Sequence, residues 1–103
     1  MTHINLGIAY YCKDQISTSK NHFERALNLI DLRLGKNDNK WMNLCKFIAL
    51  IGLNKNIEAG LIGEKLTKFN LTPPNLESIK FRLNILYENT GENRFKEFGD
   101  LYK

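Results

Sequence analysis

The stretch LGIAYYCKDQISTSKNHFERAL, residues 6–27, decides the fold because it contains two helical patterns separated by a short polar break. Around this break, apolar residues recur three or four positions apart, at Ile4, Ile8 and Tyr11 and then at Phe23, Ala26, Leu27, Ile30 and Leu34. Such spacing gathers apolar side chains on one face of a helix. The polar residues 13–15 are typical of a tight turn. We therefore expect two antiparallel helices joined by a few residues.

The rest of the 103-residue chain continues in the same way, without the alternating pattern that predicts a strand. Polar breaks divide it into six helices and lie near residues 35–39, 54–56, 70–75 and 90–92. Three columns repeat with steps of 38 and 39 residues: Leu6, Leu44 and Leu83; Tyr10, Ile48 and Tyr87; Asp14, Gly52 and Gly91. A shared step indicates three copies of one helix pair, at about residues 1–38, 39–76 and 77–103. An ordinary bundle of amphipathic helices is the alternative that the pattern leaves open.

The first helix pair matches a known signature, W-x2-L-G-x2-Y followed by A-x3-F, at Leu6, Gly7, Tyr10, Ser19, Phe23 and Ala26. It departs from the signature at His3, which replaces the Trp, and at Asp31, which replaces the closing Pro. The pair thus resembles a tetratricopeptide repeat. This resemblance implies an all-α fold, a right-handed superhelix of about three antiparallel helix pairs in the manner of an α-solenoid. It also implies that Trp41, in the Trp column of the second pair, lies in the core.

The repeats are longer than the usual 34 residues because the second helix runs from about residue 16 to residue 34. In this respect they resemble the peptide-sensing regulators of Gram-positive bacteria and their phages, the Rap, NprR and arbitrium-receptor group. In those regulators a tetratricopeptide array binds a short signalling peptide. The resemblance implies that the partner here is a peptide or a protein segment. Since the chain begins almost inside a repeat, we also expect it to be a piece of a longer array.

The same alignment implies a set of ligand-binding side chains on the first helix of each pair, which lines the concave face of such an array. They are Asn5, Ile8, Tyr11, Asn43, Lys46, Phe81, Arg82 and Ile85. Asn5, Asn43 and Arg82 share one repeat position, where an amide can pair with a peptide backbone and a guanidinium with a carboxylate. The apolar residues of this face leave two interpretations open. They hold apolar side chains of a peptide, or they pack against a missing element or against a second copy in a homodimer.

Charge and composition disfavour several other functions. The net charge is +4, but the basic residues are interleaved with acidic ones, so we do not expect a nucleic-acid surface. No apolar run approaches the roughly 20 residues that cross a bilayer, and we expect a cytoplasmic protein. Cys12, Cys45, His3 and His22 show no metal-ligand or disulfide spacing, and no phosphate-binding glycine loop occurs. The sequence therefore predicts no metal, no cofactor and no enzymatic activity.

Overall fold

The computed structural model describes residues 2–34, 40–69 and 71–102 of the chain. Within these residues it contains helices and no strand, so the all-α prediction is confirmed. The six α-helices and one terminal 3-10 helix are α1 (Thr2–Cys12), α2 (Ile16–Leu34), α3 (Lys40–Gly52), α4 (Asn56–Thr67), α5 (Pro73–Thr90), α6 (Asn93–Gly99) and η1 (Asp100–Tyr102). None of the helices in the described ranges has the length and apolar character that a bilayer crossing requires.

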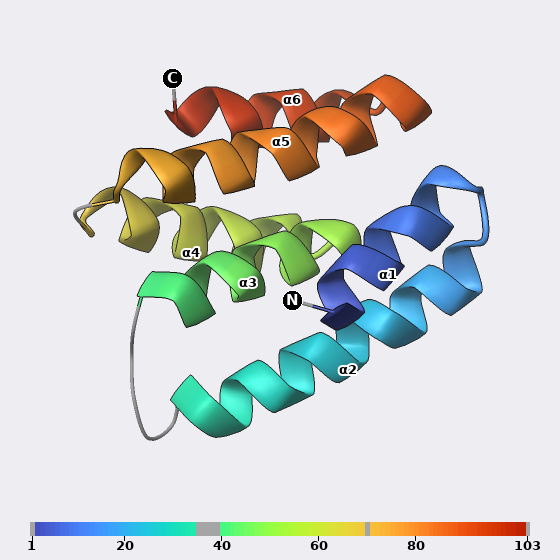
Figure 1. Cartoon of the computed structure of the whole chain (residues 1–103), viewed down its shortest axis with the longest axis horizontal. Helices are drawn as coiled ribbons and strands as arrows, with labels where there is room; N and C mark the ends of the chain where they lie inside the picture. The colour runs from blue at the N-terminus through green and yellow to red at the C-terminus, as the bar shows by residue number, and fades with distance from the viewer. Residues whose placement is uncertain (1, 35–39, 70, 103) are drawn as a thin grey trace.

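Neighbouring helices pack in pairs, α1 on α2, α3 on α4 and α5 on α6, and α2 also packs on α3 (Figure 1). The first helices of the three pairs, α1, α3 and α5, all contact one another. The contact between α1 and α5 departs from a strictly linear stack, in which each helix pair contacts only its neighbours. It brings the first third of the chain against the last third.

One aromatic ring organises the packing of the first three helices. Phe23 on α2 is fully buried and lies against Gly7 on α1 and Gly52 on α3. A Cβ atom on Gly7 would lie 2.8 Å from the Phe23 ring, and one on Gly52 would lie closer still. The Ser19 hydroxyl donates a 2.7 Å hydrogen bond to the carbonyl oxygen of Gly7. These three signature residues thus form a close contact between α1 and α2.

Each turn within a helix pair contains one residue in the left-handed region of backbone space. These residues are Asp14 with φ 62°, Asn54 with φ 61° and Gly91 with φ 71°. Asp, Asn and Gly are the residues that adopt this conformation at low cost. In the repeated column Asp14, Gly52 and Gly91, by contrast, Gly52 is the residue that corresponds to the second turn. Gly52 is the last residue of α3, and its small size serves the contact with Phe23.

Candidate functional site

A groove lies where α1 meets α5, and we call it the α1–α5 groove. It has a volume of about 390 Å³ and is lined by Asn5, Ile8, Ala9, Cys12, Phe81, Arg82, Ile85 and Asn89. Ile8 is buried and Ile85 is half-buried, so the floor of the groove is apolar. Five of the eight predicted binding residues meet here, namely Asn5, Ile8, Phe81, Arg82 and Ile85. The other three lining residues, Ala9, Cys12 and Asn89, are not among the eight predicted ones.

The guanidinium of Arg82 is fixed at the mouth of this groove by two neighbours. Its Nε atom donates to Oδ1 of Asn5 on α1 at 3.3 Å, and its Nη1 atom donates to the Ser78 carbonyl oxygen at 3.2 Å. Nη1 also donates to the Ser78 hydroxyl. None of the described residues accepts a hydrogen bond from Nη2. Arg82 therefore keeps donor capacity for a ligand while its own position is held.

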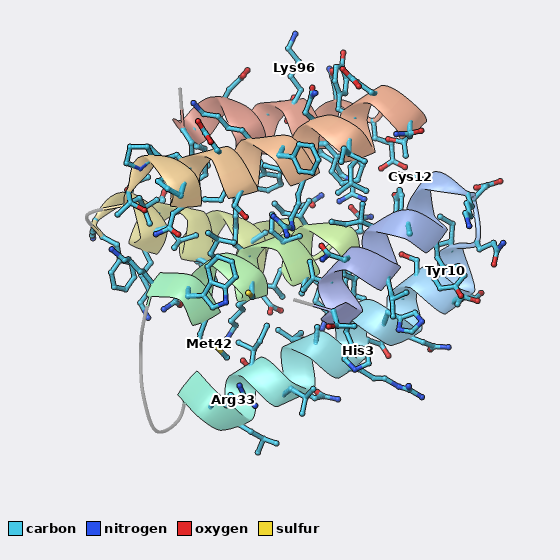
Figure 2. All side chains as sticks on the ribbon, in the orientation of Figure 1. His3, Tyr10, Cys12, Arg33, Met42 and Lys96 are labelled. Atoms are coloured by element: carbon cyan, nitrogen blue, oxygen red, sulfur yellow. The ribbon has the colours of Figure 1, made fainter. Side chains whose placement is uncertain are left out.

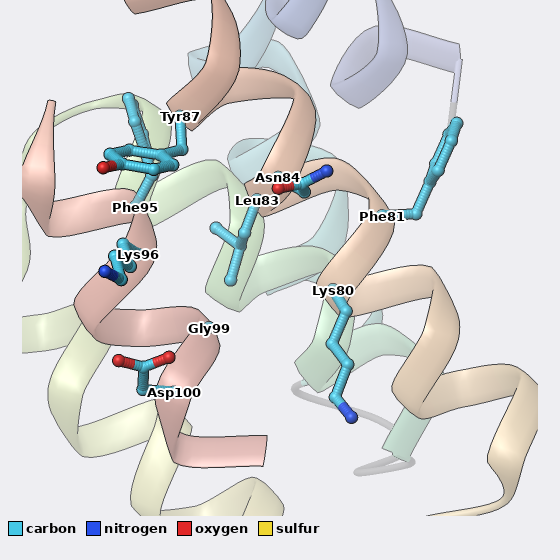
Figure 3. Close-up of a pocket in the computed structure, with 9 residues that line it drawn as sticks. All are labelled: Lys80, Phe81, Leu83, Asn84, Tyr87, Phe95, Lys96, Gly99 and Asp100. Atoms are coloured by element: carbon cyan, nitrogen blue, oxygen red, sulfur yellow. The ribbon is translucent and has the colours of Figure 1, made fainter. Parts of the chain in front are cut away.

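Phe81 forms the rim between two hollows of the surface. Its side chain is 64% exposed, and it lines both the α1–α5 groove and a second pocket of about 390 Å³ between α5 and α6. Figure 3 shows this second pocket, with Leu83 and Phe95 in its wall and Lys96 on α6, while Phe81 points away from the α6 side. An aromatic ring so exposed offers a large apolar surface to a partner.

Two predicted binding residues, Asn43 and Lys46, do not reach the groove, although they were expected to line it together with Asn5 and Arg82. Asn43 is 1% exposed, because α1, α3 and α5 contact one another and its position on α3 lies in the interior. Lys46 forms a 2.9 Å ion pair with Asp31 of α2 instead. The structure therefore does not bring these two α3 residues together with Asn5 and Arg82 in the groove.

Tyr11, the remaining predicted residue, belongs to a polar cluster with two residues that the sequence analysis missed, Glu92 and Arg94. Its hydroxyl contacts both carboxylate oxygens of Glu92 at 2.8 Å and accepts a hydrogen bond from Nη2 of Arg94 at 2.8 Å. Burial, followed by the hydrogen bond to Glu92, raises the pKa of Tyr11. Arg94 also contacts Glu92 through Nε at 3.0 Å and donates to the carbonyl oxygen of Ile51. This cluster joins the end of α1 to the start of α6 and the end of α3.

Trp41 was expected in the core, but its side chain is 43% exposed. It lies in the first turn of α3, at the edge of a pocket of about 400 Å³ that is also lined by Leu29, Arg33 and His3. Leu29 is 50% exposed. We call the surface formed by Leu29 and Trp41 the Trp41 patch.

The wall of the groove contains the thiol of Cys12. Burial raises the pKa of the Cys12 thiol in the groove wall, and it raises the pKa of the Cys45 thiol as well. A raised pKa favours the protonated thiol over the nucleophilic thiolate. Among the residues that the structure describes, no three or more His, Cys, Asp or Glu side chains are grouped so that they could hold a metal ion.

Comparisons of the chain with protein-family models, with curated proteins and with solved structures found no match.

Proposed function

We propose that the chain is a tetratricopeptide-like binding module whose α1–α5 groove holds a segment of a peptide or of another protein. The observation that carries this proposal is an exposed aromatic ring, Phe81, beside a fixed guanidinium, Arg82, at the mouth of an apolar groove. Aromatic and Arg side chains are the residues that contribute most at protein interfaces. A partner that covers Phe81 removes apolar surface from water, which favours binding.

The lining of the groove indicates the chemistry of the partner. Ile8 and Ile85 offer apolar surface for an aliphatic or aromatic side chain. Arg82 brings a positive charge, and no acidic side chain lines the groove among the described residues. A segment that places an apolar side chain next to a carboxylate therefore fits the groove best, because Nη2 of Arg82 can donate a charge-assisted hydrogen bond to the carboxylate. At the edges, Nδ2 of Asn5 can donate to a backbone carbonyl group and Oδ1 of Asn89 can accept from a backbone N–H group, while their other amide atoms pair with Arg82 and with the Ile85 carbonyl oxygen.

The likeness of the repeats to peptide-sensing regulators supports a more specific proposal, that this chain is the ligand-sensing part of a bacterial regulator. In that role it has no enzymatic activity of its own, works in the cytoplasm and transmits the presence of a peptide to the rest of the regulator. The contact between α1 and α5 gives this role a physical basis, since a ligand in the groove touches the first and the third helix pair together.

A selection from a library of random peptides displayed on phage tests the proposal. Peptides that bind the purified chain are synthesised, and their affinities are measured by fluorescence polarisation. We expect Phe81→Ser and Arg82→Ala each to weaken binding by about tenfold or more, the usual effect of losing a central interface residue. Ile57→Ser is the matched control, since Ile57 is an 85% exposed apolar residue on α4 that is absent from the groove lining. Equal affinity for all three variants would refute the groove assignment.

The Trp41 patch favours a second function, self-association in a larger assembly. Exposed apolar patches beside a pocket often mark contact surfaces. The chain contains a single Trp, so tryptophan fluorescence reports on this patch alone. If two copies bury the patch, the emission maximum shifts to shorter wavelength and the mass in light scattering doubles as the concentration rises. We expect Trp41→Gln to remain monomeric, and a native chain that stays monomeric at high concentration would exclude this function.

A further inference from the structure

Two imidazole rings that lie 19 residues apart in the sequence face each other between α1 and α2. The Nδ1 atoms of His3 and His22 are 3.5 Å apart, whereas the ring centres are 5.7 Å apart and the planes differ by 24°. The two nitrogen atoms therefore lie on the facing edges of the rings. Tyr10 stacks on His22 with ring centres 5.4 Å apart and planes within 1° of parallel, so the tyrosine ring lies along one face of that imidazole.

We propose that His3 and His22 form a binding site for a divalent transition-metal ion such as zinc. The two Nδ1 atoms are the protein ligands, and water fills the remaining positions. Zinc binds imidazole nitrogen at about 2.0–2.1 Å with tetrahedral geometry, which requires two ligand nitrogens about 3.4 Å apart. The observed separation of 3.5 Å meets this requirement. A tilt of both rings about the soft Cβ–Cγ torsion directs their lone pairs to one point beside the line between the nitrogens.

The protonation chemistry of the pair is compatible with this role. Without a metal, the two Nδ1 atoms can share one proton in a hydrogen bond. When a metal binds, the proton on Nδ1 of one ring is lost to water and Nε2 of the same ring takes up a proton, so that both neutral imidazoles offer an Nδ1 lone pair to the ion. Nitrogen ligands select zinc, copper and nickel over the hard ions magnesium and calcium.

The position of the pair gives an ion a path from solvent. Both rings are only half-buried, and His3 also lines the 400 Å³ pocket beside Trp41. Figure 2 shows His3 at the side of α1 that faces α2. Since the described residues contain no third His, Cys, Asp or Glu grouped with the pair, two positions stay open to water. We therefore expect an exchangeable ion rather than one on which folding depends.

The test is a calorimetric titration of the full, metal-free chain with Zn²⁺. We expect saturable binding of one ion. We expect His3→Gln and His22→Gln each to weaken this binding by at least about tenfold, because losing a metal ligand lowers the affinity at least as much as losing a residue that supports a ligand. Mg²⁺ is the negative control, and we expect no binding of this ion. Cys12→Ser combined with Cys45→Ser is the protein control, because these are the chain's only cysteines, and we expect it to bind Zn²⁺ like the native chain.

Three outcomes would overturn the proposal: no saturable binding, binding that the cysteine control loses, or binding that survives in His22→Gln. The last would place the ion on His3 and other groups of α1 instead of on the pair. Thermal unfolding of each variant in a chelator shows whether it folds like the native chain. If one histidine variant fails to fold, the other still decides between these outcomes.

Discussion

Arg82 on α5 donates a 3.3 Å hydrogen bond from Nε to Oδ1 of Asn5 on α1, across 77 residues of sequence. The bond lies at the mouth of the α1–α5 groove and is exposed to solvent. On the α5 side the same guanidinium is held by Ser78. Asn5 therefore acts on a ligand in two ways, through its own amide and by orienting Arg82.

The first prediction follows from this bond. We expect Asn5→Ala to weaken peptide binding by about three- to tenfold, while the free energy of unfolding falls by less than about 1 kcal/mol because the bond is exposed. Affinity is measured by fluorescence polarisation and stability by urea unfolding. Asn21→Ala, at an exposed position on α2, is the control: it should leave affinity unchanged and gain the same helix propensity as Asn5→Ala, so the difference in stability between the two variants reports on the bond. A large loss of stability in Asn5→Ala would show that the bond holds the fold together instead.

The second prediction concerns the close contact at Phe23. A Cβ on Gly52 would collide with the buried Phe23 ring, and we expect Gly52→Ala to lower the free energy of unfolding by about 1–3 kcal/mol, as overpacking does. Gly60 is the matched control, since it is also helical and a Cβ there meets nothing within 4 Å. Gly60→Ala should raise the free energy of unfolding by up to about 1 kcal/mol through helix propensity. Urea unfolding that gives both variants the same sign would contradict this account.

The helices and the Phe23 contact could be predicted from the sequence because they depend on local periodicity and on the sizes of a few residues. The contact among Gly7, Ser19 and Phe23 does not depend on the position of the third helix pair. The α1–α5 contact could not be predicted, since it depends on how two distant helix pairs are rotated relative to each other. That rotation buries Asn43 and brings Asn5 to Arg82, although all three share one column of the sequence.

The other contacts that the sequence analysis missed also join residues that are far apart in the sequence. Glu92 and Arg94 follow the turn at Gly91 and carry no pattern that links them to Tyr11, yet the fold places all three in one cluster. His3 and His22 have no ligand spacing in the sequence but lie on facing helices. One signal was available for the groove, because Ser78 stands four residues before Arg82 and such pairs meet on a helix surface.

The third prediction is a pH dependence at Tyr102. This side chain is 5% exposed, its hydroxyl donates to the Gly63 carbonyl oxygen at 3.0 Å, and burial raises its pKa to about 12. In the unfolded chain a tyrosine has a pKa of about 10. Above that pH the unfolded state loses a proton that the folded state keeps, so stability falls as the pH rises from about 10 to about 12.

We expect Tyr102 to contribute a loss of about 1–1.5 kcal/mol by pH 11, half-way through the interval set by a difference of about two pKa units. Urea unfolding of the native chain and of Tyr102→Phe at pH 8 and at pH 11 isolates the contribution. The variant is expected to be less stable at pH 8 by about 1 kcal/mol for the lost hydrogen bond, but to lose less stability on going to pH 11. The same pH slope in both proteins would mean that Tyr102 ionises normally.

The last prediction concerns Arg94, whose guanidinium joins three helices. It contacts Tyr11 and Glu92, donates to the carbonyl oxygen of Ile51 and lies 4.2 Å from the centre of the Phe95 ring. A lysine keeps the charge but cannot reproduce the planar fork that reaches these partners together.

We therefore expect Arg94→Lys to lower the free energy of unfolding by about 1–3 kcal/mol, because it leaves partly buried acceptors without a donor. Arg25→Lys is the control, since Arg25 is exposed on α2 and such surface changes stay within about 0.5 kcal/mol. Both variants keep the net charge, so a difference between them in urea unfolding reports on the geometry of the fork. Equal stability would show that Arg94 acts only as a charge beside Glu92, and that the end of α1 is held to α6 by packing of Tyr11 on Phe95 instead.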